Sequence, residues 1–263
     1  MHPRSKAVFD NAKRDSRGVL IGYITAGFPN LDRCAEILKS LSESGVDLIE
    51  IGIPYSDPVM DGPVIQQASE ISLSGGFRTE EIFELISKIP IPTYVMSYWN
   101  PIERYGVAEF LKNLKAAGGV GVITPDLTIE ESEEWVFLTD KEEIDRTYVV
   151  APSSSDLRLD QVSRACSGFV YAASLMGVTG AREVLSGEAR NLVTRLRHHT
   201  NSPIAVGLGV SNAHQAREIC EYADGVIVGS AFIKAAMSAP DSSVAAAVGK
   251  LAAELASGVR VKV

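Results

Sequence analysis

The sequence predicts a single-domain (β/α)8 barrel, or TIM barrel, that covers residues 1–263 and carries an extra helix at its N-terminus. Short β-branched runs alternate with longer amphipathic segments along the whole chain, and eight such pairs can be counted. The hydrophobic share of 46% is enough for a large core, and barrels of this length are common as one domain. No linker-like tract rich in Gly, Ser or Pro divides the chain.

The predicted elements follow one another in regular order. The strands are residues 19–25, 48–52, 93–98, 121–124, 147–151, 168–172, 204–207 and 225–228. Apolar spacing predicts helices at residues 31–44, 79–88, 107–117, 129–138, 157–165, 187–199, 212–222 and 242–257, after a first helix near residues 3–13. Ser155 or Asp156 is expected to cap one helix, and Ser211 another. A doubly wound open sheet is the alternative, but TAGFPN replaces its GxGxxG fingerprint after the first strand.

Composition limits the classes of function. The net charge of −8 argues against a general binder of nucleic acid or of anionic membranes. No apolar run reaches the roughly 18 residues that a membrane span needs, and the charged N-terminus lacks the apolar core of a signal peptide. The three cysteines, Cys34, Cys166 and Cys220, are widely spaced and indicate reduced thiols. We therefore expect a cytoplasmic protein.

Acidic residues gather after the second strand, in LIEIGIPYSDPVMDGP. Glu50 lies near the end of an apolar strand, where an unpaired buried carboxylate is costly. Asp57 and Asp61 follow in a long connection, residues 53–63; a second long connection covers residues 173–186. Singly, each acid could be a salt-bridge partner or a turn residue. Together they suggest a general acid/base pair at the carboxyl ends of barrel strands, where such folds hold their active sites.

A phosphate site is predicted after the last two strands. Gly207 and Gly209 allow the backbone to approach a ligand, and Gly229 and Ser230 open a short helix at residues 231–237. Backbone N–H groups and the helix dipole bind anions there, and barrels often bind phosphate after strands seven and eight. The alternative is that these glycines only form tight turns, with Ser230 as a cap.

Aromatic residues at the strand ends suggest the rest of the pocket. Tyr23, Tyr98 and Tyr171 end three predicted strands, and they fit either a packed core or a pocket for a flat apolar substrate. Asp126, after the fourth strand, could line the rim, cap the helix near residue 129 or brace a loop. No His lies at a strand end, so we expect neither a metal site nor a Ser-His-Asp triad.

Seven motifs spread over nearly the whole chain resemble the tryptophan synthase α subunit family: YITAGFP, IEIGIPYSDPVMDGPVIQQAS, SYWNPIERYG, VITPDLTIEES, YAASLMGVTGAR, AVGLGVS and GSAFIK. The resemblance implies cleavage of indole-3-glycerol phosphate to indole and glyceraldehyde 3-phosphate, a retro-aldol reaction with no cofactor in this chain. It also implies an α2β2 complex, in which indole passes to a β subunit that carries pyridoxal phosphate. Asp57-Pro58 and the segment after Asn100-Pro101 resemble surfaces that face this subunit.

The resemblance also assigns roles. Glu50 matches the catalytic acid/base that protonates indole C3, and Asp61 matches the acid that hydrogen-bonds the indole N–H. Tyr171 matches a tyrosine beside the catalytic Glu, and Thr179 a lid residue that contacts Asp61 when its loop closes. The matches to the phosphate cradle are Gly180, Gly209, Gly229 and Ser230. Three residues depart from the family pattern, namely Met60, Thr128 and Leu208, the last where many members carry Phe.

Alternatives remain within this prediction. The chain could be a stand-alone indole-3-glycerol phosphate lyase that releases free indole, although the interface-like motifs favour the complex. It could instead be a non-catalytic partner that activates a β-like enzyme, but Glu50 and Asp61 are both present. A third alternative is another sugar-phosphate barrel; the lack of a Lys at a strand end beside the acids argues against a synthase of that kind.

Overall fold

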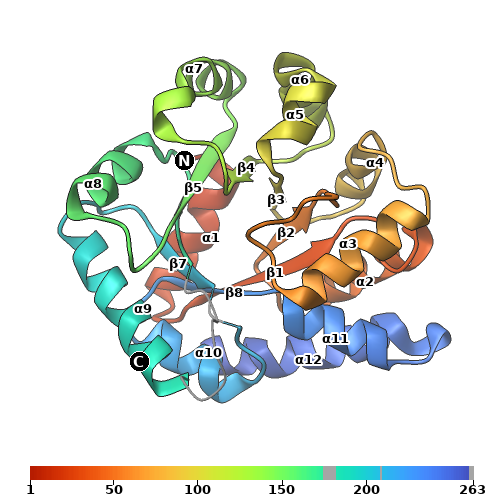
Figure 1. Ribbon diagram of the computed structural model, residues 1–263. Coiled ribbons are helices and arrows are strands. Elements are labelled where there is room, and N and C mark those ends of the chain that lie inside the picture. The colour runs from red at the N-terminus through yellow and green to blue at the C-terminus, as the bar shows by residue number, and fades with distance from the viewer. Residues whose placement is uncertain (174–181, 208, 261–263) are drawn as a thin grey trace.

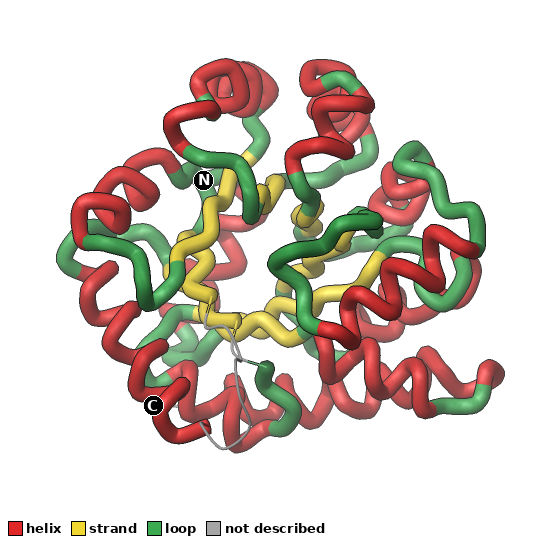
Figure 2. Tube along the Cα trace, viewed as in Figure 1, coloured by secondary structure: helices red, strands yellow, loops and turns green. Residues whose placement is uncertain are grey.

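The computed structural model describes residues 1–173, 182–207 and 209–260. Its strands form one closed, parallel barrel in the order β1 to β8, and β1 pairs with β8 to close it (Figures 1 and 2). The strands are β1 Val19–Thr25, β2 Leu48–Gly52, β3 Thr93–Met96, β4 Gly121–Thr124, β5 Asp145–Val150, β6 Val170–Ala173, β7 Ile204–Gly207 and β8 Gly225–Val228. The predicted (β/α)8 barrel is therefore confirmed.

Helices surround the barrel (Figure 2). They are α1 Pro3–Arg14, α2 Leu31–Glu43, α3 Pro63–Ser74, α4 Glu81–Ser87, α5 Trp99–Tyr105, α6 Val107–Ala116, α7 Glu133–Glu142, α8 Asp156–Ala165, α9 Arg182–Arg197, α10 Ala213–Cys220, α11 Ser230–Ser238 and α12 Val244–Val259, with 3-10 turns η1 Ile129–Glu131 and η2 Asp241–Ser243. The extra N-terminal helix is α1. No helix in the described part of the chain is long and apolar enough to cross a bilayer.

Five strands have the predicted bounds, and three differ at their ends. β3 ends at Met96, and Tyr98 is already the residue that precedes the first turn of α5, where its side chain makes no capping hydrogen bond within the described chain. β5 begins two residues early, at Asp145, whose carboxylate accepts a hydrogen bond from buried Tyr94 at 2.6 Å. A polar residue that is satisfied inside the fold does not give the apolar signal of a strand. β6 is displaced toward the C-terminus and begins at Val170.

Two helices, α3 and α5, were not predicted. The buried face of α3 consists of small or hydroxyl side chains, Ala68, Ser69 and Ser72, so its apolar periodicity is weak. The α5 helix has only seven residues, too few for a periodic pattern. The predicted helix at residues 129–138 is η1 followed by α7, and α9 begins at Arg182, inside the connection predicted for residues 173–186.

The predicted helix caps had mixed outcomes. The Ser155 hydroxyl accepts a hydrogen bond from the Arg158 N–H at the start of α8, as expected. The prediction of Ser211 was wrong, because Asn212 caps α10 by accepting from the Gln215 N–H at 3.0 Å. The Ser211 N–H instead donates to the side chain of Gln215. An amide oxygen one residue later has the better position for this cap.

The hydrophobic core has two layers. One lies between the strands and the outer helices, and the other fills the barrel interior. Strand alternation separates them: on β2, Leu48 belongs to the interior, whereas Ile49 and Ile51 face the helices. Phe9 of α1 packs into the interior layer, so α1 covers one end of the barrel and is visible through the ring of strands in Figure 1.

Glycines make room for large side chains inside this barrel. A Cβ atom on Gly121 would lie 2.2 Å from the ring of Tyr94, on the neighbouring strand. Tyr94 is fully buried, and its hydroxyl is held by Asp145, so the ring cannot move aside. The pair shows how small and large residues on adjacent strands together fill the interior.

Gly121→Ala should therefore destabilise the fold by about 1–3 kcal/mol, since the added methyl overpacks a rigid interior. Gly187→Ala is the matched control: no described atom lies within 4 Å of its Cβ position on α9, so alanine should be neutral or stabilising by up to about 1 kcal/mol. Urea unfolding curves of both variants measure the difference. Equal midpoints for the two variants would contradict the packing argument.

Candidate active site

Glu50 projects into the barrel interior from the middle of β2. It shares the inward face with Leu48, two residues earlier, and its Cα pairs in register with those of Tyr23 on β1 and Tyr94 on β3. The side chain is fully buried, and neither carboxyl oxygen has a hydrogen-bond partner among the described residues. A buried, unpaired carboxyl is costly for folding, which points to a role in function.

The two acids of the predicted pair have different pKa values. Burial, reinforced by the nearby charge of Asp61, raises the pKa of Glu50 to about 8. Burial also raises the pKa of Asp61, to about 6, although a hydrogen bond from Tyr98 opposes this rise. At neutral pH, Glu50 therefore holds its proton and Asp61 is mostly ionised. Two carboxyls with separated pKa values can serve as an acid and as a fixed negative charge.

Asp61 lies on the connection between β2 and α3, which Tyr98 fastens to the barrel. The Tyr98 hydroxyl donates to Asp61 Oδ2 at 3.1 Å and accepts from the Met60 N–H at 2.9 Å. Its ring packs on Tyr55, with centroids 5.1 Å apart. From α3, Gln66 donates to the Asp61 carbonyl at 2.9 Å. These contacts position the Asp61 carboxylate although it is on a loop.

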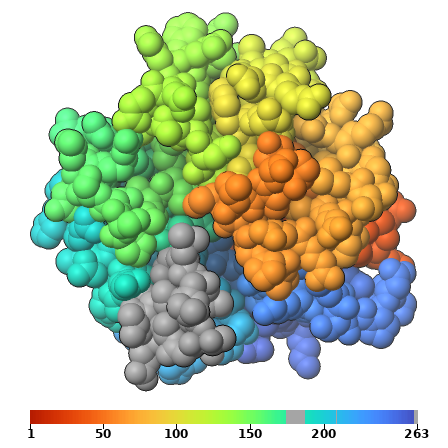
Figure 3. All heavy atoms as spheres, in the orientation of Figure 1, coloured from red at the N-terminus to blue at the C-terminus, as the bar shows by residue number. Residues whose placement is uncertain are grey.

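The other two candidate acids are not part of this pair. Asp57 is exposed and accepts a hydrogen bond from the adjacent Ser56 hydroxyl. Asp126 accepts the Trp99 N–H with both carboxylate oxygens, at 2.9 and 3.1 Å. It therefore braces the start of α5 and does not cap η1, which begins after Thr128. The connection that bears Asp57 lies in the orange region that projects over the face shown in Figure 3.

Tyr23 and Tyr171 share the inward face of the barrel with Glu50. Burial raises the pKa of both phenols well above the usual value, and the charge of Glu50 adds to this for Tyr171. The space for their rings comes from glycines on neighbouring strands. A Cβ on Gly52 would lie 2.3 Å from the Tyr23 hydroxyl, and one on Gly207 would lie 2.7 Å from that of Tyr171. The rings of Tyr23 and Tyr171 thus pack closely against the neighbouring strands on the inward face of the barrel.

The predicted phosphate site includes Gly229, which lies next to the Tyr23 ring. Gly229 precedes α11, and among the described residues no side chain caps this helix. The first N–H groups of a helix have no partner within it and can bind an anion. A Cβ on Gly229 would come within 3.0 Å of the Tyr23 ring. Gly209 has φ of +62°, a conformation that favours glycine. Ser230 is the first residue of α11. Three further candidates, Thr179, Gly180 and Leu208, lie outside the described residues.

A sequence model of the family described as tryptophan synthase alpha chain matches residues 9–259. The chain belongs to the tryptophan synthase alpha chain family. It is 49% identical over 260 residues to the tryptophan synthase alpha chain of Mycobacteroides abscessus, covering 98% of this chain and 97% of that relative. The alpha chain of Salinispora arenicola is 50% identical over 256 residues, which are 96% of each chain.

Solved structures agree with this assignment. A structure of Mycobacterium tuberculosis tryptophan synthase superposes with a TM-score of 0.92 at 43% identity, covering 99% of this chain and 100% of that one. The tryptophan synthase subunit alpha of Legionella pneumophila gives a TM-score of 0.89 at 28% identity, with 98% of each chain covered. This alpha chain thus has the family fold over nearly its whole length.

Sequence patterns did not single out all the residues that shape this site. Gly52 has the role of leaving space for the Tyr23 ring, and Tyr55 packs on Tyr98. Both residues lie in the quoted family motif, but only the structure shows what they contact. Among the described residues, no group of three or more His, Cys, Asp or Glu could hold a metal ion.

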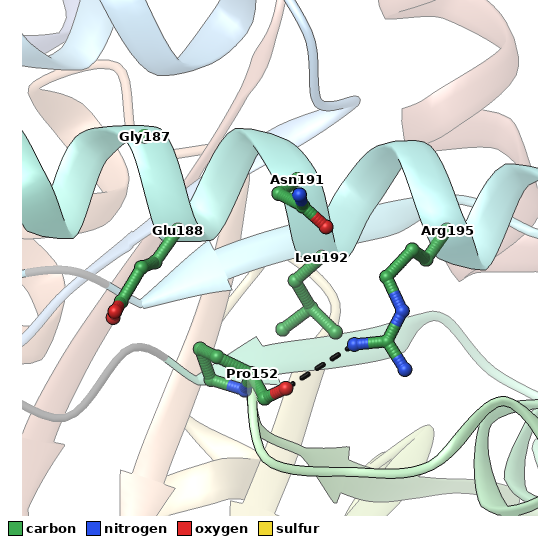
Figure 4. Close-up of a pocket in the computed structure, with 6 residues that line it drawn as sticks. All are labelled: Pro152, Gly187, Glu188, Asn191, Leu192 and Arg195. Carbon is green, nitrogen blue, oxygen red and sulfur yellow. Dashed lines mark hydrogen bonds between the residues drawn. The ribbon is translucent and has the colours of Figure 1, made fainter.

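A cavity of about 430 Å³ lies apart from the predicted site residues (Figure 4). It separates the connection after β5 from α9, and its lining is Pro152, Gly187, Glu188, Asn191, Leu192 and Arg195. The Arg195 guanidinium donates to the carbonyls of Pro152 and Ser154 and to the carboxylate of Asp156. Arg195 of α9 thus uses its hydrogen-bond donors to hold α9 to the connection after β5 and to the start of α8, which is a structural role.

Tyr98→Phe removes the hydroxyl that donates to Asp61. Because this hydrogen bond favours the ionised carboxylate, the pKa of Asp61 should rise above its value of about 6. A carbon-13 NMR titration of labelled Asp side chains measures the change. In the control Tyr105→Phe, the lost hydroxyl contacts Asn113, and the Asp61 pKa should stay unchanged. A constant Asp61 pKa in both variants would show that Tyr98 has no influence on it.

Glu50 should also make stability depend on pH. Folded Glu50 keeps its proton up to about pH 8, whereas an unfolded carboxyl loses it near 4.5, so the folded state binds more protons between these values. The free energy of unfolding therefore falls as pH rises through this range. Glu50→Gln cannot ionise and should remove roughly 2–4 kcal/mol of this fall.

Urea unfolding between pH 4.5 and about 8.5 tests this expectation. The control Glu109→Gln alters an exposed carboxylate and should keep the pH dependence of the unaltered chain. If Glu50→Gln and Glu109→Gln show the same slope, Glu50 is not the group that titrates.

Proposed function

We propose that this chain uses Glu50 and Asp61 to cleave indole-3-glycerol phosphate to indole and glyceraldehyde 3-phosphate, the lyase half-reaction of tryptophan synthase. Membership of the alpha chain family supports the reaction, which needs no cofactor in this subunit. The observation that carries the assignment of roles is the fully buried carboxyl of Glu50, which has no hydrogen-bond partner among the described residues, together with a second acid that is oriented by Tyr98. We further propose that residues 1–263 form one domain.

Glu50 supplies and then recovers a proton. With a pKa of about 8 it is protonated at neutral pH and can donate to indole C3, which gives a cationic indolenine with its charge on the ring N–H. The carboxylate so formed accepts the proton of the glycerol hydroxyl next to the ring. The C–C bond then breaks, its electron pair returns to the ring, and an aldehyde and neutral indole are formed.

Asp61 balances the charge that develops on the ring nitrogen. It is ionised at neutral pH, and its carboxylate is held by Tyr98 before the substrate binds. A fixed carboxylate that accepts the indole N–H stabilises the cationic indolenine more than the neutral substrate, which lowers the barrier. Tyr23 and Tyr171 offer flat apolar surfaces for the ring.

The phosphate is assigned to the loops after β7 and β8. The N–H groups in the first turn of α11, with Gly229 and Ser230, suit the phosphate oxygens, and Gly209 completes the cradle. Gly180 is expected to join them, and Thr179 to contact Asp61. This assignment places the phosphate beside Tyr23, which packs close to Gly229.

The expected partner is a tryptophan synthase β subunit that carries pyridoxal phosphate, in an α2β2 complex. Support comes from the connection after β2, where Val59 is 81% exposed and Met60 36% exposed beside Asp57. Exposed apolar side chains next to a charged residue are typical of a protein-binding surface. The three free cysteines fit a reducing, cytoplasmic location.

The purified chain, assayed for indole release from indole-3-glycerol phosphate with and without a β subunit, tests this function. Glu50→Gln should lower kcat by at least about 100-fold, because it keeps the shape of the side chain and removes its proton. Asp61→Asn should lower kcat by about 100-fold to 1,000-fold through loss of one preorganised charge. Glu109→Gln, on the exposed face of α6, should leave the rate unchanged.

The outcomes separate the alternatives. Strong activation by the β subunit supports the complex, and high turnover without it supports a stand-alone lyase. Release of no indole under either condition would refute the cleavage reaction for this chain. Substantial cleavage by Glu50→Gln would refute only the proposed role of Glu50 and would leave the cleavage reaction itself standing.

A further inference from the structure

A column of aromatic rings runs through the barrel interior from α1 to the candidate active site. The Phe9 ring of α1 lies 6.0 Å from the ring of Phe169, and Phe169 lies 6.5 Å from Tyr171. Tyr94 supports the middle of the column, with its centroid 5.2 Å from that of Phe169. Phe169 directly precedes β6 and Tyr171 is its second residue, and both belong to the interior layer of the core.

Hydrogen bonds hold the part of the column that is nearest to α1. The Tyr94 hydroxyl donates to Asp145 Oδ2 at 2.6 Å, and the backbone N–H of His2, just before α1, donates to Asp145 Oδ1 at 2.6 Å. The Phe169 carbonyl accepts the Thr147 hydroxyl at 2.9 Å. The Asp145 carboxylate therefore links the residue before α1 to β3 and β5, and Thr147 of β5 links that strand to Phe169 just before β6.

Close packing prevents the middle of the column from shifting alone. Tyr94 and Phe169 are both fully buried. A Cβ on Gly168 would lie 2.8 Å from the Thr147 hydroxyl and 2.9 Å from the Tyr94 hydroxyl, so the backbone beside Phe169 has no spare room. A ring in such an environment keeps one position, and loss of its volume lets its neighbours move.

The end of the column that is farthest from α1 is Tyr171, which faces the barrel interior as Glu50 does. Tyr171 lies over Gly207, whose missing side chain gives room for the phenol, and it is close enough to Glu50 for the two to interact electrostatically. The centroid of Phe169, just before β6, lies 6.5 Å from that of Tyr171. The position of the Tyr171 ring between Phe169 and Gly207 thus depends on Phe169.

We propose that Phe169 is a positioning residue for the cleavage reaction, which holds the Tyr171 ring in its place on the inward face that Tyr171 shares with Glu50. The proposal rests on the proposed function, because it concerns the same acid. Phe169 does not touch the reacting atoms; it acts through Tyr171. The contacts that carry the proposal are the two ring pairs on either side of Phe169 and the packing that prevents a shift.

Phe169→Leu tests the proposal, in complex with the β subunit. The shorter side chain leaves space below Tyr171, so kcat should fall about 10-fold to 100-fold, as a small misplacement of an active-site group does. KM should change less than about 3-fold, since the proposed phosphate contacts are untouched. Water that reaches Glu50 should lower its pKa, so the loss of activity at high pH should begin at a lower pH than in the unaltered chain.

Phe110→Leu is the matched control. Phe110 is also fully buried, but it lies on α6 outside the barrel and packs on Phe83 and Tyr105. It should cost similar stability, with kcat and the pH profile unchanged. Phe9→Leu, at the edge of the column, should shift the profile in the same direction by less, and it serves in place of Phe169→Leu if that variant does not fold.

A carbon-13 NMR titration of the Glu50 carboxyl keeps this test independent of turnover. The proposal predicts a lower Glu50 pKa in Phe169→Leu and an unchanged one in Phe110→Leu. Equal Glu50 titration and equal pH profiles in both variants would overturn it, even if both lose stability. Absence of indole release by the unaltered complex would refute the cleavage function, while the NMR comparison would still decide whether Phe169 controls Glu50.

Discussion

The site depends on one constraint: a carboxyl group is buried, without a hydrogen-bond partner in the described structure, inside a closed barrel. Desolvation favours the protonated form of such a group, and this is what makes Glu50 an acid at neutral pH. The arrangement is tolerated because the barrel contributes two large apolar layers around it. A closed parallel barrel also has no strand edge through which water could solvate the carboxyl.

The same constraint explains why the two acids need different supports. Glu50 is on a central strand, where the backbone is fixed on both sides by β1 and β3. Asp61 is on a connection, where its charge is kept by partial exposure and by the Tyr98 hydroxyl. A rigid, dry position raises the pKa further than a loop position that is solvated on one side. Two carboxylic side chains thereby differ in protonation through their surroundings alone.

The sequence predicted most of the fold because apolar periodicity is a local property. It failed where burial involves small or polar groups: Ser69 and Ser72 in α3, and Asp145 in β5. The acids and tyrosines could be named from motifs, since each ends or follows a strand. The residues that the acids and tyrosines contact could not be predicted from the motifs. The bond between Tyr98 and Asp61 joins residues 37 positions apart, and only the closed barrel defines that distance.

The two ends of a barrel are usually assigned separate duties, stability at the N-terminal ends of the strands and chemistry at the C-terminal ends. The interior between the two ends is a packed core of side chains. Here the interior is filled by rings in continuous contact, from Phe9 to Tyr171, and Asp145 binds Tyr94 at the lower end. Strand periodicity places such rings in line, because every second residue faces inward. In a close-packed column, a displacement at one end has little space in which to be absorbed, so the packing of α1 and the position of the Tyr171 ring depend on each other through Phe169.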